Sequence, residues 1–145
     1  MAYATVQDMV DRFTEAEMRQ LAPAPAGTVP PYVTTTIERA LTDASAELDS
    51  YLAVKFPVPL TAGLPLLTKA ACDLAREALD RQGREPVLEA GKRARCWAKD
   101  VAAGRATLGS GPGGDAEAVP EVEGGVQILT SDRVFTDVGL EGYLR

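Results

Sequence analysis

Two carboxylates, Glu77 and Asp80, form the pattern in this sequence that comes closest to an active site. Residues three apart on a helix share one face, so this pair could hold Mg²⁺ together with the phosphates of a substrate. Acidic residues at this spacing are equally typical of helix faces that contact only water. The pair therefore admits two interpretations, a Mg²⁺-dependent hydrolase and a solvated helix surface.

A nucleotide hydrolase of this kind needs a second pair of carboxylates on a neighbouring helix. All-α nucleoside triphosphate pyrophosphohydrolases combine an ExxD pair with an ExxE pair. The nearest upstream candidates here, Asp43 and Glu47, are four residues apart, and Asp49 lies off their face. We therefore predict no metal site and no catalytic residues, and keep a small all-α Mg²⁺-dependent nucleotide pyrophosphohydrolase as an alternative.

The sequence contains no histidine, and so lacks the commonest general base and the commonest metal ligand. A serine or cysteine nucleophile would have no histidine to activate it. The segment GSGPGG lacks the GK[ST] ending of a phosphate loop and follows a helix rather than a strand. We expect a protein that is not an enzyme and uses no cofactor.

The two cysteines, Cys72 and Cys96, match no zinc or redox spacing. Both fall within helical patterns, which favours two buried thiols in a reducing compartment. No apolar run approaches the roughly 20 residues that span a bilayer, and the N-terminus lacks the pattern of a secretory signal. We expect no membrane contact and synthesis in the cytoplasm.

Apolar residues recur at helical spacing through the first hundred positions. We predict two short helices and three longer ones, over residues 6–12, 15–21, 34–54, 65–80 and 86–103. Proline-rich segments separate them, since proline fixes φ and removes a hydrogen-bond donor. The expected fold is all-α, a small bundle of four to five helices with an extended C-terminal tail and, as a further option, a short β-hairpin.

Several residues are of the types that begin and end helices. Thr5 with Asp8 and Thr14 with Glu17 resemble capping boxes. Pro65 and Pro86 stand where a first-turn proline is favoured, and Gly104 resembles the glycine that follows a helix. These signals predict where four of the helices start and where the last one ends.

Three regions follow from this pattern. Residues 1–108 form the predicted helical bundle domain. Residues 109–125 are rich in glycine and proline, which indicates a flexible linker or, at EVEGGVQI, a hairpin. Residues 126–145 form a predicted C-terminal docking tail.

The net charge of −6 is unevenly spread. Residues 1–80 and 106–145 each carry a balance of −5, whereas residues 81–105 carry +4. Within this basic block, Lys92, Arg95 and Lys99 share a helix face. The face has three interpretations: a solvated surface near the negative end of its helix, a contact with an acidic neighbour including another copy of the chain, and a weak phosphate-backbone site.

The tail carries large apolar side chains beyond the predicted linker. Two interpretations are open: the tail covers a helix face of its own bundle, or it docks on another protein through main-chain and apolar contacts. The candidate docking residues are Arg133, Val134, Phe135, Leu140, Tyr143 and Leu144.

Nearly the whole chain resembles a family of small tailed-bacteriophage proteins from Mu-like prophages. The resemblance is carried by AYATVQDMVDRF, ALTDASAELDSYLAVKFPVPL, the pattern LxxxACDLAR, WAKDVAAGRATLG and RVFTDVGLEGY. Its most specific parts are residues 49–60 and 97–109. The glycine-rich segment 109–125 departs from the family pattern and would lengthen the reach of the tail.

The resemblance implies a virion protein at the head–tail interface, an adaptor or head-completion protein without an active site. Such connectors look like small helical bundles that form a homo-oligomeric ring, commonly of twelve copies, beneath the portal protein and around the DNA channel. Their partners would be the portal, a tail, stopper or terminator protein, and DNA in non-specific proximity. Gene transfer agents use related parts. A stand-alone helical regulator or chaperone is the remaining alternative.

Overall fold

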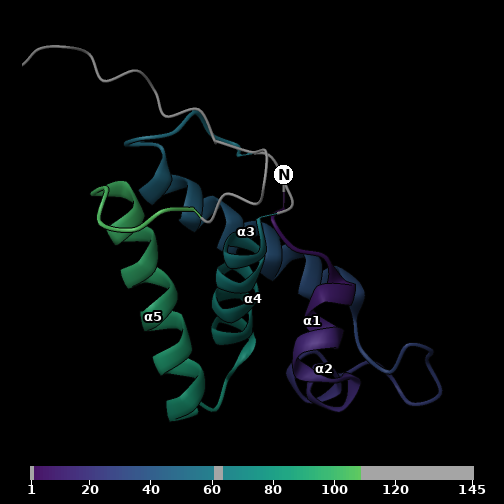
Figure 1. Cartoon of the computed structure of the whole chain (residues 1–145). Helices are drawn as coiled ribbons and strands as arrows, with labels where there is room; N and C mark the ends of the chain where they lie inside the picture. The colour runs from purple at the N-terminus through teal and green to yellow at the C-terminus, as the bar shows by residue number, and fades with distance from the viewer. Residues whose placement is uncertain (1, 61–63, 109–145) are drawn as a thin grey trace, which may run out of the picture.

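The computed structural model describes residues 2–60 and 64–108, which form five α-helices and no β-strand (Figure 1). The expected all-α bundle is confirmed for this part of the chain. The predicted linker or hairpin over 109–125 and the tail over 126–145 lie outside the described residues. The helices are α1 (Val6–Phe13), α2 (Glu15–Leu21), α3 (Thr34–Leu52), α4 (Pro65–Leu79) and α5 (Glu85–Ala102).

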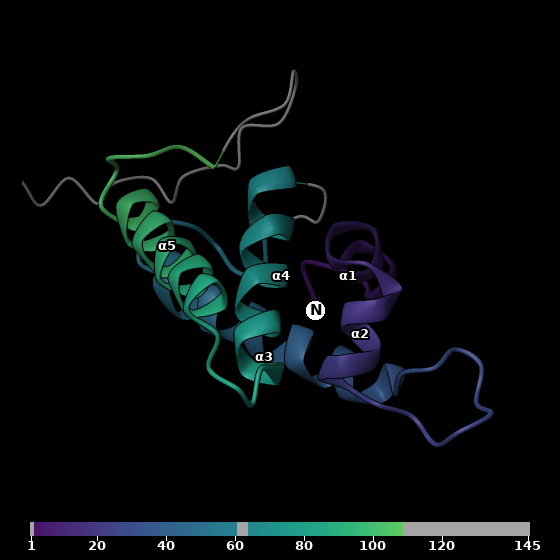
Figure 2. The ribbon, with the colours of Figure 1, turned by 90° about the horizontal axis from the view of Figure 1, so that it is seen from below.

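The long helix α3 forms one layer, and the other helices pack across it (Figures 1 and 2). Helix α4 lies in the middle, with α5 on one side and the α1–α2 pair on the other. This central position explains why α4 buries seven of its 15 residues, including Leu67, Leu74 and the three alanines Ala70, Ala71 and Ala75. Small side chains there let three neighbouring elements approach closely.

The cap of α1 follows the sequence prediction. The Thr5 side chain accepts a hydrogen bond from the Asp8 N–H, and the Asp8 carboxylate accepts one from the Thr5 N–H. The hydrogen bond from the Thr5 backbone, followed by that from its side chain, holds the pKa of Asp8 below its ordinary value. The backbone N–H groups of Thr5 and Asp8, which have no partner within the helix, are both satisfied by these bonds.

The predicted capping box at Thr14 and Glu17 is wrong. Thr14 has a positive φ of 71° and makes no side-chain cap hydrogen bond. Its N–H instead donates to the Val10 carbonyl and closes α1. Because a single residue joins α1 to α2, the chain must reverse at Thr14, which removes the extended backbone that an N-cap needs.

The ends of the longer helices agree with the prediction to within two residues. Pro65 opens α4, and Gly104 follows α5 with a φ of 73°, as a glycine after a helix should. Helix α3 stops at Leu52 rather than at residue 54, and α5 starts at Glu85, one residue before Pro86.

Tyr3 attaches the segment before α1 to the rest of the bundle. Its N–H donates to Ser45 Oγ at 3.0 Å, and its carbonyl accepts from Thr68 Oγ1 at 3.0 Å. Its hydroxyl donates to the Asp49 carboxylate and accepts from the Leu60 N–H. The backbone and side chain of one buried residue therefore tie the N-terminal segment to α3, α4 and the connection between them.

Candidate interaction sites

A half-buried arginine, Arg95, joins the three long helices. Its Nε donates to Glu47 Oε1 on α3 at 2.6 Å, and its Nη1 donates to Glu77 Oε2 on α4 at 2.8 Å. The hydrogen bond to Glu47, against an opposing desolvation, and then that to Glu77 raise the pKa of Arg95 above its ordinary value. Two carboxylates on one guanidinium form a clamp in which every charged group has a partner.

Gly91 on α5 makes room for this clamp. A Cβ atom placed on Gly91 would lie 1.5 Å from Glu77 Oε2, so a side chain here would require the carboxylate to leave its present position. The signal in the sequence was a glycine in the interior of a helix, which costs stability unless packing requires it.

The carboxylates of the hydrolase alternative, Glu77 and Asp80, are both held by arginines of this chain. Asp80 accepts from Arg84 Nε at 2.9 Å and from the N–H groups of Gln82 and Arg84. Desolvation raises the pKa of Asp80, but these hydrogen bonds outweigh it and hold the pKa below its ordinary value. Across residues 2–60 and 64–108, no three His, Cys, Asp or Glu side chains are grouped to hold a metal ion.

A second network, centred on Glu17, attaches α2 to the C-terminal part of α4 and to Arg84. Glu17 Oε1 accepts from Arg76 Nη2 at 2.6 Å and from Arg84 Nη2 at 3.0 Å. The Arg76 guanidinium also lies 4.5 Å from the centroid of the Phe13 ring, within the range of a cation–π contact. The α1–α2 pair is thereby held on the bundle by charge as well as by apolar packing.

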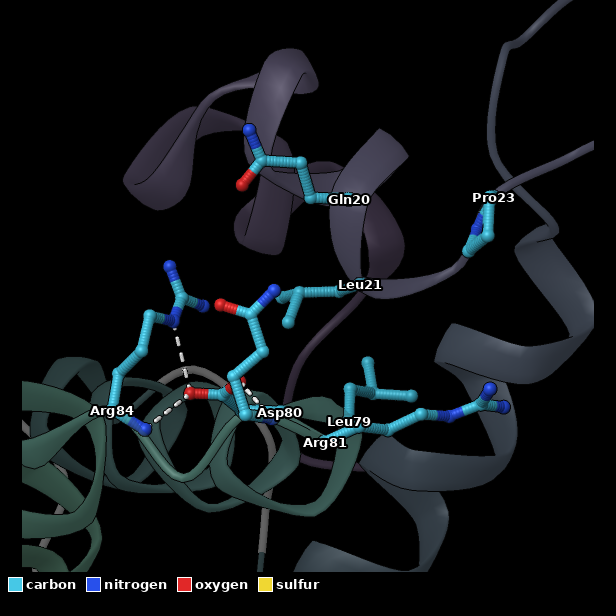
Figure 3. A pocket seen from close by; sticks show the side chains of 8 residues that line it. Gln20, Leu21, Pro23, Leu79, Asp80, Arg81 and Arg84 are labelled. Atoms are coloured by element: carbon cyan, nitrogen blue, oxygen red, sulfur yellow. Dashed lines mark hydrogen bonds and ion pairs between the residues drawn. The ribbon is translucent and has the colours of Figure 1, made fainter.

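A small cavity of about 170 Å³ lies beside this network, between the end of α2 and the turn from α4 to α5 (Figure 3). Leu21, Leu79 and Pro23 supply apolar walls. The polar lining comes from Gln20, Asp80, Arg81, Gln82 and Arg84. Ligand sites for nucleotide-sized molecules occupy roughly 300–1,000 Å³. This cavity is smaller, and suits a single side chain.

Sequence reasoning missed this cavity because its two walls stand some sixty residues apart in the chain. Gln20 and Leu21 end α2, whereas Arg81 and Gln82 belong to a turn. Neither segment has a spacing that marks a site. Only the packing of α2 against the end of α4 brings them together.

The three residues of the predicted basic face of α5 do not all face the solvent. Lys92 and Lys99 are exposed, and Arg95 turns inward to its clamp. Lys92 pairs with Glu89 at 2.7 Å, and Lys99 Nζ lies 5.7 Å from the Tyr51 ring centroid. Arg93, which was not among the predicted contact residues, is exposed on this face. The exposed basic face of α5 therefore consists of Lys92, Arg93 and Lys99.

The prediction of two buried thiols holds for one cysteine only. Cys72 is buried on α4, where desolvation raises its pKa to about 12. Cys96 is exposed on the outer side of α5. The error arose because residue 96 lies within a helical pattern but points away from α3 and α4.

Exposed apolar side chains mark two places on the described surface. Val29 is 92% exposed in the loop between α2 and α3. Val54, Val58 and Leu66 are exposed in and beside the connection from α3 to α4. Helix α5 ends near that connection (Figure 1). The six predicted docking residues, from Arg133 to Leu144, lie outside the described residues.

Comparison with known proteins relates the chain to phage proteins. The family described as "Bacteriophage Mu, Gp36" matches residues 3–127. The chain is also 34% identical over 140 residues to "Gene product J" of Escherichia phage Mu. The aligned region covers 94% of this chain and 95% of that relative. No helix among the described residues is long and apolar enough to cross a membrane.

Proposed function

Because the chain belongs to the Bacteriophage Mu Gp36 family, we propose that it is a structural protein of the virion, an adaptor that connects the head to the tail. The family match over nearly the whole chain is the observation that carries this proposal. In it, copies of the chain form a ring beneath the portal protein and around the DNA channel. A tail, stopper or terminator protein binds the other side of the ring.

The distribution of charge on the bundle supports lateral contacts between copies. Helix α5, which carries the exposed basic face, and the α1–α2 pair lie on opposite sides of α4 (Figure 2). On the α1–α2 side, Asp11 and Glu15 are exposed and form no ion pair with another described residue. A contact between two different, complementary surfaces repeats from copy to copy and closes into a ring when the rotation allows it. We propose twelve copies.

The overall charge supports a channel through which DNA can slide. The chain carries a net charge of −6. Protein–DNA affinity depends on Lys and Arg side chains that displace counterions from phosphates. A ring of net acidic subunits repels the DNA backbone over the range of the Debye length, so the genome passes without adhering.

Exposed apolar side chains at one end of the bundle favour a contact with the portal. Val54, Val58 and Leu66 are exposed at the end of the bundle where α5 ends, and residues 109–145 follow later in the chain. We propose that this end faces the portal, and that Phe135, Leu140 and Tyr143 of the tail are the anchor side chains.

Co-sedimentation with the portal tests this function. The full-length chain, produced together with the portal of its own particle, should sediment with it, and deletion of residues 130–145 should abolish the association.

The ring needs a separate test. Lys92→Glu with Lys99→Glu should lower the assembled fraction at least about tenfold, whereas Arg39→Glu, an exposed charge on α3, should leave it unchanged. Full association of the deletion variant, or unchanged assembly of the double variant, would contradict the respective contact.

The proposed role involves no catalysis. The two carboxylates that suggested a Mg²⁺-dependent hydrolase are engaged by Arg95 and Arg84. A pyrophosphate-release assay with nucleoside triphosphates and Mg²⁺ should give no turnover above buffer. Turnover that is lost in Glu77→Gln would overturn the proposal in favour of the hydrolase.

A further inference from the structure

The cavity between α2 and the α4–α5 turn has the composition of a peptide-binding pocket. Leu21, Leu79 and Pro23 make its apolar walls (Figure 3). Among the described residues, Gln82 donates a hydrogen bond through its backbone N–H only, and no hydrogen bond involves the side chain of Gln20 or Gln82. Arg81 is exposed and forms no ion pair within the described part of the chain. An apolar floor with a few unused polar groups on its rim is typical of a binding site.

The size and charge of the pocket define what fits it. A volume of about 170 Å³ accommodates one large aliphatic side chain and excludes a whole small-molecule ligand of ordinary size. Asp80 is fully engaged by hydrogen bonds from Arg84 and Gln82, so the free charge at the rim is the positive charge of Arg81. The matching ligand is an aliphatic side chain next to a carboxylate.

The chain itself contains such a segment. Residues 109–145 carry seven acidic and two basic side chains. Within residues 126–145, Leu140 and Glu141 are the position at which a leucine directly precedes a carboxylate, and glycines flank the pair on both sides. Small neighbours would let the leucine enter a shallow pocket without steric conflict.

We propose that the pocket binds Leu140 of the same chain, with Glu141 paired to Arg81. The pocket lies beside the turn from α4 to α5, and the 18 residues of α5, about 27 Å long at 1.5 Å per residue, separate that turn from the segment that ends at Leu108. The 31 residues between Leu108 and Leu140 span up to about 100 Å when extended. The segment can therefore reach the pocket of its own bundle.

Attachment to the same chain favours this intramolecular contact over one between copies. A tethered ligand has an effective concentration on the order of mM, whereas a second copy in a purified sample is present at µM. In the proposed connector, this contact covers the apolar tail until the portal competes for it. The inference concerns the free protein, so it can fail while the connector function stands.

Disulfide trapping in the full-length chain tests the contact. The background is Cys96→Ser, which leaves only the buried Cys72. Gln20→Cys on the pocket rim is combined with Gly142→Cys, and the control pair combines Arg93→Cys with Gly142→Cys. At low micromolar protein, the pocket pair should form an intramolecular disulfide at least about tenfold faster than the control pair, as judged by non-reducing electrophoresis and mass spectrometry.

A charge reversal separates a specific contact from random encounter. Adding Arg81→Glu to the pocket pair should lower the trapping rate to that of the control pair, whereas adding Arg93→Glu should leave it unchanged. Equal rates for the two cysteine pairs would overturn the proposal. Disulfide-linked dimers in place of the intramolecular product would also overturn it, because the tail would then bind a second copy.

Discussion

Gly91 and Glu77 lie so close that a Cβ atom on residue 91 would be 1.5 Å from the Glu77 carboxylate. At this level of the α4–α5 contact, the Glu77 carboxylate therefore occupies the space that a side chain on residue 91 would fill. The contact brings Glu77 within hydrogen-bond distance of Arg95, which also binds Glu47 on α3. The packing of the three long helices thus depends on a glycine and an arginine on the same helix.

The substitution Gly91→Ala tests whether the contact between residue 91 and Glu77 constrains the packing. The test is whether the substitution raises or lowers the free energy of unfolding. In an ordinary helix interior, Gly→Ala stabilises by about 1 kcal/mol. Here we expect the clash to lower the free energy of unfolding by about 1–3 kcal/mol, measured by urea denaturation. In a Glu77→Ala background the clash is gone, so Gly91→Ala should be neutral or stabilising. Stabilisation in the wild-type background would show that Glu77 moves aside at no cost.

Arg76 is expected to matter more for stability than an exposed arginine does. Arg76→Gln removes both hydrogen bonds to Glu17 and the stacking on Phe13. Loss of these contacts around a mostly buried carboxylate should lower the free energy of unfolding by about 1–3 kcal/mol. Arg93→Gln, on the exposed face of α5, should change it by less than about 0.5 kcal/mol. Equal effects in urea titrations would contradict the role assigned to the Glu17 network.

Tyr3 should make stability fall at alkaline pH. Burial, and then the hydrogen bond to Asp49, raise the pKa of Tyr3 from 10.0 to about 12. The unfolded chain therefore loses this proton near pH 10, and the folded chain keeps it until about pH 12. The free energy of unfolding should fall as pH rises through this window, and Tyr3→Phe should remove that part of the fall.

Cys72 contributes in the same direction, so the Tyr3 test needs a control. Burial raises the pKa of the Cys72 thiol from 9.0 to about 12, and its contribution to stability starts to be lost near pH 9. Denaturation series at several pH values should therefore compare Cys72→Ala with the double variant Cys72→Ala, Tyr3→Phe. Parallel pH profiles for the two proteins would mean that the Tyr3 hydroxyl is not protected by folding.

The two thiols should differ sharply in reactivity. Cys96 is exposed, whereas Cys72 is buried with its thiolate disfavoured. With a thiol-specific disulfide reagent at pH 8, the native chain should release one equivalent quickly, and the second only after urea is added. Cys96→Ser should abolish the fast phase. A fast phase of two equivalents would contradict the burial of Cys72.

Local signals predicted much of the fold. The Thr5 cap, the first-turn Pro65 and the terminal Gly104 each depend on a few adjacent residues, and each was placed correctly. The cap at Thr14 failed because the connection from α1 to α2 is a single residue long. The chain reversal that this short connection forces at Thr14 therefore overrode the capping-box pattern.

The sites were harder to predict, because they depend on which side of a helix faces a neighbour. Lys92, Arg95 and Lys99 share a helical spacing, but only the structure shows that Arg95 faces Glu47 and Glu77. The pocket beside Arg81 combines segments that are distant in sequence. No spacing within either segment could have indicated it.

The central claim, that the chain connects a portal to a tail as a ring, is tested most directly by electron microscopy. The full-length protein should be imaged in complex with the portal of its own particle. We predict a closed ring of this chain, of twelve copies, coaxial with the portal and around its channel. Portal particles that lack this density at saturating protein, while the added chain stays monomeric in solution, would contradict the claim.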